Sequence, residues 1–369
     1  MRDRYGSLVP VDLAPGVPAT LVIGYRTAVR IMHDPDHFPS DPRLWEQTVP
    51  SDCPILPVLQ WRPNASRNSG AEHTHYRQAN TAAVDGVDLY ALQDKVEEVA
   101  TSLIGTFCSA GNADLISQYA LPLASQVINF MLGCPPEIGQ QAGKALMTIF
   151  DGVNPDEGNH MLIEAVAELI ALKKVEPDDD ITTRLLQHPN HLDDAEVAHQ
   201  VIVLYGAGIE PLQNLIANSL ILMLTDDRFS GGVLGGSLST RDALDEVLFK
   251  EPPLANICVT YPRQPILIDG VWLPAHQPVV ISVTGCNTDP AIMSAELTGN
   301  RSHLTWGAGP HACPARSMAY LTAQSAIDQL IDVLPEIQLA TPADELSWRV
   351  GVFHRALAAL PVVFPKARR

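Results

Sequence analysis

The sequence lacks the features of several common classes of protein. Its six cysteines lie far apart and form no Cys-x-x-Cys pair, so neither a disulfide framework nor a zinc site is indicated. Basic residues are scarce, with 24 Lys and Arg against 42 Asp and Glu. The resulting formal charge of −18 argues against nucleic acid as a partner, because phosphate binding needs a basic surface.

Long apolar runs are also missing. No uninterrupted apolar stretch of about 18 residues, the length needed to span a membrane, is present, and Met1–Tyr5 does not open a signal peptide. We therefore expect a soluble, cytoplasmic protein with no membrane partner. The hydrophobic content of 46% is sufficient for a sizeable core. Large single-domain enzymes reach the length of 369 residues, and we expect one domain over residues 1–369.

One cysteine near the carboxyl end is distinguished by its neighbours. Residues 304–316 read LTWGAGPHACPAR, and apolar residues at helical spacing follow from Met318 to Leu334. The pattern predicts that Cys313 lies at a helix start, with Pro314 in the first turn, where its missing N–H costs nothing. Because unpaired N–H groups at a helix start stabilise negative charge, this arrangement favours a thiolate.

The residues before the cysteine suit a flat, anionic ligand. Gly307 and Gly309 let the backbone bend close against a planar group, and His311 can reach an anionic edge. The alternative interpretation is a buried cysteine in a glycine-containing loop, since free cysteine is commonly a small core residue.

This loop resembles the haem-binding loop of the cytochrome P-450 family, whose pattern is an aromatic residue, Gly, any residue, Gly, any residue, His, any residue, Cys. The matching positions are Trp306, Gly307, Gly309, His311 and Cys313, with Trp where Phe is usual. The resemblance implies that Cys313 is the axial ligand of the iron of haem b, a thiolate whose electron density favours O–O cleavage. It also implies that Trp306, Gly307 and His311 contact the haem.

A second histidine stands four positions before an arginine. The preceding stretch, Asp52–Gly70, is broken by prolines and predicts a surface loop, after which a helix begins. The spacing puts His73 and Arg77 on one helical face, able to meet one anion, although such pairs are usually a solvated face. The same spacing follows the same loop in the family. The resemblance implies that the loop selects substrate and that His73, Arg77 and His311 hold the haem propionates.

The longest helical pattern runs from Asp193–Asp194 to about Thr225, roughly 50 Å at 1.5 Å per residue. Residues 204–211 within it read LYGAGIEP, and two glycines and a proline inside a helix are costly. Pro211 cannot donate to the carbonyl of Ala207 and pushes it aside. We expect a kink and an acceptor without its helical donor, or else a tolerated kink in a buried helix.

The same turn occupies the place of the family's oxygen-binding groove, where the usual text is Ala-Gly-x-acid-Thr. Ala207, Gly208 and Glu210 match this text, which implies that they are catalytic positions. Pro211 replaces the alcohol that passes protons. We expect the groove to persist and the hydroxyl relay to be lost, unless Glu210 or ordered water substitutes.

Two arginines of the family are missing. The buried Glu-x-x-Arg pair would fall on Glu246 and Phe249, so Glu246 needs another partner or an exposed position. An arginine that holds a haem propionate in the family is Thr260 here. Arg263, three residues further on, is the alternative contact.

The resemblance covers essentially the whole chain and implies a mainly α fold with a small β region (α+β), a triangular helical prism with one long central helix. Because no flavin or iron–sulfur motif is present, electrons are expected from a separate ferredoxin and its NAD(P)H-dependent reductase.

The unusual features are similar to those of bacterial members that crosslink aromatic side chains in short ribosomally made peptides, the biarylitide type. These features are Pro211, the lost Glu-x-x-Arg pair and the short chain. Joining Tyr to His or to another aromatic residue of a small peptide is therefore the first hypothesis. Hydroxylation of a small secondary metabolite is the second, and haem binding without catalysis is the third.

Overall fold

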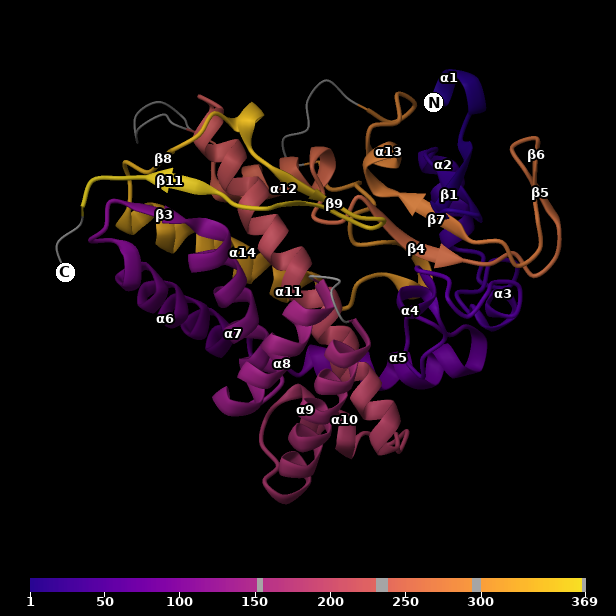
Figure 1. The fold of residues 1–369 in the computed structure, drawn as a ribbon, viewed down its shortest axis with the longest axis horizontal. Helices are drawn as coiled ribbons and strands as arrows, with labels where there is room; N and C mark the ends of the chain where they lie inside the picture. Colours follow the sequence, from indigo (N-terminus) through magenta and orange to yellow (C-terminus); the bar gives the residue numbers. More distant parts are fainter. Residues whose placement is uncertain (151–154, 230–237, 294–299, 367–369) are drawn as a thin grey trace. The chain divides into compact units, whose positions relative to one another are not determined.

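The computed structural model describes residues 1–150, 155–229, 238–293 and 300–366 (Figure 1). The chain divides into two compact units. Unit 1 comprises Met1–Arg77, Leu248–Cys313 and Val350–Arg355, and unit 2 comprises Gln78–Val247, Pro314–Arg349 and Ala356–Arg369. That they act as one domain stays a prediction.

Unit 1 is built on a four-stranded sheet with the order β1-β2-β7-β4. Strands β1 and β2 form an antiparallel hairpin, β7 pairs parallel with β2, and β4 pairs antiparallel with β7. The bounds are β1 (Leu8–Ala14), β2 (Val17–Val22), β4 (Asn256–Thr260) and β7 (Val279–Ser282). Helix α2 (Tyr25–Met32) buries Ala28 and Ile31 in the same core cluster as residues of these strands.

Short elements complete unit 1. Strands β5 (Ile266–Ile268) and β6 (Val271–Leu273) pair through a tight turn, in which Asp269 and Gly270 both have positive φ, as expected for an Asp-Gly hairpin. The helices are α1 (Arg2–Tyr5), α3 (Arg43–Glu46), α4 (Leu56–Leu59) and α13 (Val283–Asn287). Helices α5 (Gly70–Asp85) and α12 (Thr240–Lys250) each belong partly to unit 1 and partly to unit 2.

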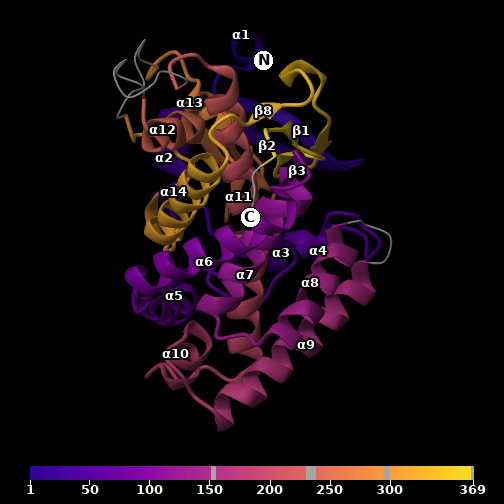
Figure 2. The same cartoon turned by 90° about the vertical axis from the view of Figure 1, so that its left-hand side faces the viewer.

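Unit 2 is mainly helical. Its helices are α6 (Leu89–Phe107), α7 (Leu121–Met131), α8 (Pro136–Phe150), α9 (Pro155–Val175), α10 (Ile181–Gln187), α11 (Asp194–Thr225) and α14 (Arg316–Val333). Helices α8 and α9 lie side by side in both views (Figure 1, Figure 2). A small sheet of β3 (Asn112–Asp114), β11 (Pro361–Val363) and β8 (Gln338–Leu339) completes the unit. Strands β9 (Trp348–Val350) and β10 (Arg355–Leu357) form a separate pair.

Helix α11 confirms the longest predicted helix. Its amino end is fixed by a capping box: the Asp193 carboxylate accepts from the Glu196 N–H at 2.8 Å, and the Glu196 carboxylate accepts from the Asp193 N–H at 2.9 Å. The helix continues through Pro211, and residues 212–220 are all buried. Within the described ranges, no helix has the length and apolar character of a membrane span.

Candidate active site

The cysteine loop, residues 304–313 of unit 1, is closed by its own backbone. The Gly307 N–H donates to the Leu304 carbonyl at 2.8 Å, and the Cys313 N–H donates to the Trp306 carbonyl at 2.8 Å. A single 3₁₀ turn, Gly309–His311, lies between them. These bonds hold Cys313 beside the backbone of Trp306, so the position of the half-buried thiol is set by the loop.

Both glycines of this loop have φ of +67°, in the left-handed region that side-chain-bearing residues rarely adopt. At Gly309, a Cβ would also overlap the carbonyl oxygen of Met32 and lie 3.0 Å from its carbonyl carbon. At Gly307, a Cβ would make only ordinary contacts, such as 3.6 Å to the Cys258 Sγ. Gly309 is therefore required by backbone conformation and space, and Gly307 by conformation alone.

A buried asparagine anchors the start of the loop. The Asn287 Oδ1 accepts from the Leu304 N–H at 2.8 Å, while its Nδ2 donates to the carbonyls of Leu248 and Phe249 at 3.0 and 3.2 Å. Asn287 therefore joins the loop to the carboxyl end of α12. The Asn-x-Asp-Pro text around Asn287 is visible in the sequence, but it predicted no role for this residue.

The prediction that Cys313 lies at a helix start is wrong. Helix α14 begins at Arg316, three residues later, with Ala315 as its N-cap. The reason is that Cys313 precedes Pro314, whose ring disfavours the helical conformation in the residue before it. The first helical N–H groups therefore begin beyond the cysteine, and the cysteine loop sets the thiol's backbone surroundings. None of the six cysteines is in a disulfide.

Three of the predicted haem-contacting residues come together in unit 1. The rings of His73 and His311 lie 4.2 Å apart, centroid to centroid. Arg77, one helical turn after His73 on α5, donates through its Nη2 to the Ala312 carbonyl. The predicted His-x-x-x-Arg face of α5 therefore contacts the two residues that precede Cys313.

Burial lowers the pKa of both histidines of this group. Desolvation, followed by the Arg77 charge, lowers the pKa of His73. Desolvation also dominates at His311, where it and the neighbouring His73 and Arg77 lower the pKa to about 3. His73 is 7% exposed, and its Nε2 is buried with no hydrogen-bond partner among the described residues. A buried polar atom left unpaired costs about 1–3 kcal/mol, which favours a polar ligand at this position.

These residues fit an iron porphyrin. Cys313 offers one thiolate, which completes a metal site whose equatorial ligands belong to a macrocycle. The histidines and Arg77 offer donors for carboxylates. In the part of the chain that the structure describes, no group of three or more His, Cys, Asp or Glu residues is arranged to hold a metal ion. A single thiolate, with nearby side chains that can donate hydrogen bonds to carboxylates, is an arrangement that suits haem.

Arg263 is placed differently from the other predicted contacts. It is exposed, its Nε donates to the Asp36 carbonyl at 2.7 Å, and its backbone N–H donates to the His37 carbonyl at 3.0 Å. No contact recorded for the described residues joins it to the cysteine loop. Its role at the haem stays a prediction.

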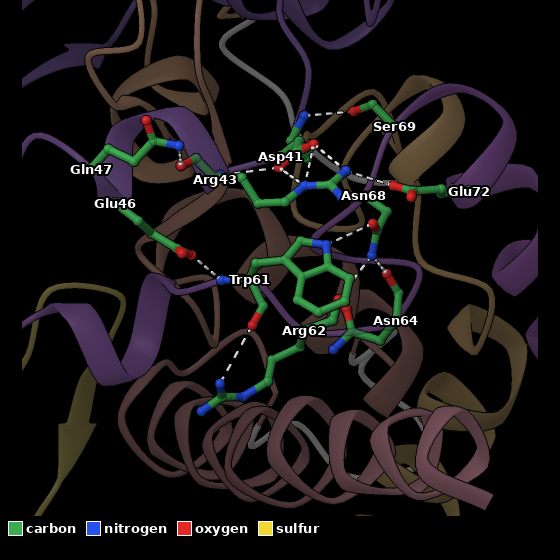
Figure 3. A network of polar contacts seen from close by, with 11 residues as sticks. Asp41, Arg43, Glu46, Gln47, Trp61, Arg62, Asn64, Asn68, Ser69 and Glu72 are labelled. Atoms are coloured by element: carbon green, nitrogen blue, oxygen red, sulfur yellow. Dashed lines mark hydrogen bonds and ion pairs between the residues drawn. The ribbon is translucent and has the colours of Figure 1, made fainter. Parts of the chain in front are cut away.

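The loop predicted between Asp52 and Gly70 contains one helical turn, α4, and is held by polar contacts (Figure 3). The Trp61 Nε1 donates to the Asn68 Oδ1 at 2.9 Å, and the Trp61 N–H donates to the Glu46 carboxylate. The Arg43 guanidinium lies over the Trp61 ring, 5.3 Å from a ring centroid, and binds Glu72 of α5 at 2.6 Å. The loop is thus tied to α3, and α3 is tied to α5.

In unit 2, α11 carries a partly exposed stripe just before its buried residues 212–220. Val203, Ala207 and Pro211 lie four residues apart, so they share a helical face, and all are partly or fully exposed. Gly208 lies close to α7, because a Cβ there would be 2.7 Å from the Ile128 Cδ1. Since Pro211 has no N–H, the Ala207 carbonyl lacks its helical donor.

Glu210 of α11 is buried and paired. Its Oε1 accepts from the Arg349 Nη2 at 3.2 Å. Arg349 could not be predicted as the partner, because 139 residues separate it from Glu210 and no local pattern links them. The Glu210 carboxylate, which was expected as a possible substitute for the hydroxyl relay, is therefore in an ion pair.

Glu246 pairs with Arg228, in place of the arginine that the family has at position 249. Its two carboxylate oxygens lie 2.9 and 3.0 Å from the Arg228 Nη2, and Arg228 also binds Asp226 at 2.6 Å. Phe249, where the family has arginine, is buried with its ring 5.4 Å from that of His303. The lost local ion pair is replaced by a pair 18 residues apart in sequence.

Comparison with known proteins finds no matching family model but many relatives. The chain is 26% identical over 314 residues to cytochrome P-450 107B1 of Saccharopolyspora erythraea, covering 81% of this chain and 77% of the relative. It is 25% identical over 382 residues to the 2-hydroxy-5-methyl-1-naphthoate 7-hydroxylase of Streptomyces carzinostaticus, covering 98% and 93%.

Solved structures match over nearly the whole chain. CYP154C4 from Streptomyces sp. W2061 has a TM-score of 0.88 at 23% identity, over 98% of this chain and 93% of that chain. The tirandamycin C-bound monooxygenase TamI has a TM-score of 0.84 at 24% identity, over 98% and 95%. These likenesses confirm the predicted fold, mainly helical with small sheets.

Proposed function

We propose that the chain is a member of the cytochrome P-450 family, an oxidoreductase of the monooxygenase class that uses haem iron and an external redox partner, and that it hydroxylates a small secondary metabolite. The naphthoate hydroxylase supports the substrate class, because its alignment covers 98% of this chain. Electrons come from a ferredoxin and its reductase.

The observation that carries the proposal is the arrangement around Cys313. When bound, the haem supplies oxygen activation at its iron, with Cys313 as the protein ligand. The cysteine loop fixes the backbone at Cys313 through the Trp306 carbonyl. His73, Arg77 and His311 offer neutral and cationic donors for the propionates. Together they would orient the cofactor and hold its carboxylates away from water.

Proton handling is proposed for the α11 turn that contains Pro211. This turn has no side-chain hydroxyl at position 211, so a threonine-type relay is absent from it. The Ala207 carbonyl, without its helical donor, can accept a hydrogen bond from water or from a substrate hydroxyl. Glu210, ion-paired with Arg349, would deliver protons through water only when that pair opens.

A second candidate function is oxidative crosslinking of aromatic side chains in a short peptide. Two observations favour it: Pro211 replaces the relay alcohol, and Glu210 is occupied by Arg349. If proton delivery is restricted, hydrogen abstraction from a phenol followed by radical coupling competes with oxygen insertion. Hydroxylation adds one oxygen to the product, whereas crosslinking removes two hydrogens.

The test is a mass measurement under ¹⁸O₂ with purified protein, ferredoxin, reductase and NAD(P)H. One set of reactions contains small aromatic metabolites, and the other contains any short Tyr-containing peptide that is encoded beside the gene. Cys313-dependent gain of one ¹⁸O in the first set supports hydroxylation. Cys313-dependent loss of two hydrogens in the second set, without gain in the first, replaces it with crosslinking.

A further inference from the structure

The loop between α4 and α5 carries an arginine, Arg67, that has no carboxylate partner among the described residues. In contrast, Arg43 nearby in the chain pairs with both Asp41 and Glu72 at 2.6 Å. The Arg67 Nη2 donates only to the Val58 carbonyl, at 3.0 Å. Desolvation, together with repulsion from Arg62, lowers the pKa of Arg67. A partly buried guanidinium without a counter-charge is costly unless a ligand supplies one.

Arg67 lies beside the cysteine loop. Its charge opposes the rise that burial causes in the pKa of Cys258, which reaches about 12. The Cys258 Sγ is in turn 3.6 Å from the Cβ position of Gly307. Two residues before Arg67, the Ala65 backbone hydrogen-bonds to the His311 ring. The segment 65–67 therefore contacts the same part of the loop that His73 and Arg77 contact.

Two more buried polar atoms of unit 1 lack partners among the described residues. The hydroxyl of Tyr261, a residue that interacts with the Arg67 charge, is buried and has no hydrogen-bond partner in the described ranges. The same holds for the Oγ1 of the adjacent Thr260, whose residue is 4% exposed. With the unpaired His73 Nε2, unit 1 offers one cation and three polar side chains for a ligand rich in acceptors.

We propose that Arg67 binds and neutralises a carboxylate of the haem, and so is the cation that Arg263 was expected to provide. A guanidinium matches a carboxylate through two parallel N–H···O bonds. Arg263, by contrast, is exposed and bonded to the Asp36 carbonyl. The assignment concerns retention of the cofactor, so it holds for hydroxylation and for crosslinking alike.

The experiment measures haem loss from the holoenzyme to excess apomyoglobin, which needs no turnover. Arg67→Gln should lose haem on the order of tenfold faster than wild type, because one charge-assisted hydrogen-bonded pair is removed. Its reduction potential should also become more negative, since a positive charge near the iron is lost. Arg67→Lys keeps the charge but cannot make two parallel hydrogen bonds to one carboxylate. Its rate of haem loss and its reduction potential should lie between those of wild type and Arg67→Gln.

Two variants separate this role from loosening of the loop. Arg43→Gln removes the arginine of α3 that contacts Trp61 of the same loop and Glu72 of α5, and it should leave haem loss within about twofold of wild type. In the Arg67→Gln background, Thr260→Arg should slow haem loss again by placing a cation on the neighbouring strand. If that double variant does not fold, the comparison of Arg67→Lys with Arg67→Gln decides the question.

Three results would overturn the proposal. The first is haem loss from Arg67→Gln at the wild-type rate. The second is equal acceleration in Arg43→Gln, or acceleration only in Arg263→Gln. The third is an unchanged rate of haem loss from Arg67→Gln, combined with a loss of affinity for a substrate carboxylic acid that is not seen for its methyl ester. That result would assign Arg67 to the substrate.

Discussion

The cysteine loop and the middle of α11 each contain two glycines one residue apart, but the two pairs serve different needs. Gly307 and Gly309 have positive φ, which a side chain rarely tolerates, whereas Gly206 and Gly208 have helical backbone conformations. Space divides each pair, because a Cβ would overlap the Met32 backbone at Gly309 and lie 2.7 Å from the Ile128 Cδ1 at Gly208, whereas Gly307 and Gly206 have room for one. The loop therefore depends on its glycines for its backbone path, and α11 does not.

The regions also differ in how they depart from the family pattern. All five pattern positions of the cysteine loop are filled, and the loop is held by local backbone bonds. In α11 the alcohol is replaced by Pro211, and the neighbouring Glu210 is paired with a distant arginine. The residues around the expected iron ligand are kept, while those expected to handle protons are changed.

The largest expected effect is in the loop. Gly309→Ala should destabilise the protein by about 3 kcal/mol or more, because left-handed backbone strain adds to overlap with the Met32 backbone. Gly307→Ala, where only the strain applies, should cost about 1–2 kcal/mol. Thermal unfolding together with haem content measures both. Equal losses in the two variants would show that the Met32 contact is unimportant.

The ion pair of α11 comes next. Arg349→Gln should destabilise by about 1–3 kcal/mol, because it leaves the buried Glu210 carboxylate without this cation. The matched control is Arg355→Gln, which breaks a pair with Glu251 of nearly the same length, 3.3 Å, between two exposed side chains. Exposed pairs contribute about 0.5 kcal/mol. The free energy of unfolding in denaturant measures both variants. A larger decrease in Arg355→Gln than in Arg349→Gln would contradict a stabilising pair between Glu210 and Arg349.

Pro211→Ala tests the proline in the helix. The variant restores an N–H donor to the Ala207 carbonyl and removes the ring clash, so we expect stabilisation by about 1–2 kcal/mol. The gain is smaller than the full helical penalty of proline, because proline also restricts the unfolded chain. A lower unfolding temperature would show that the surrounding packing depends on the ring.

The smallest effects are expected at the α11 glycines. Gly206→Ala should stabilise by about 0.5–1 kcal/mol through helix propensity alone. Gly208→Ala should gain less or lose stability, because its Cβ would press on the end of the Ile128 side chain, 2.7 Å away. Differential scanning calorimetry of the two variants makes the comparison. A loss at Gly206 would mean that its open surroundings serve a function.

The sequence was sufficient where local chemistry decides the structure. The bounds of α11 were predicted from its long helical pattern, which starts at Asp193–Asp194 and ends near Thr225. The position of α14 was predicted wrongly, because Pro314 was considered as a helix start and its effect on Cys313 was not.

Long-range pairs were beyond sequence reasoning. The partners of Glu210 and Glu246 are brought near by the fold and are not at helical spacing. The same applies to Arg67, whose proximity to His311 depends on how the loop after α4 is folded. Spacing along a helix or strand carries no information about such contacts.

The most direct test of the account is the spectrum of the reduced, carbon-monoxide-bound protein with and without the cysteine thiol. Wild type and the control Cys258→Ala, which removes a neighbouring thiol of the same unit, should show the red-shifted band of a thiolate-ligated haem. Cys313→Ala should lose that band completely. A red-shifted band that persists in Cys313→Ala, or is absent from wild type, would contradict the assignment of Cys313 as the iron ligand.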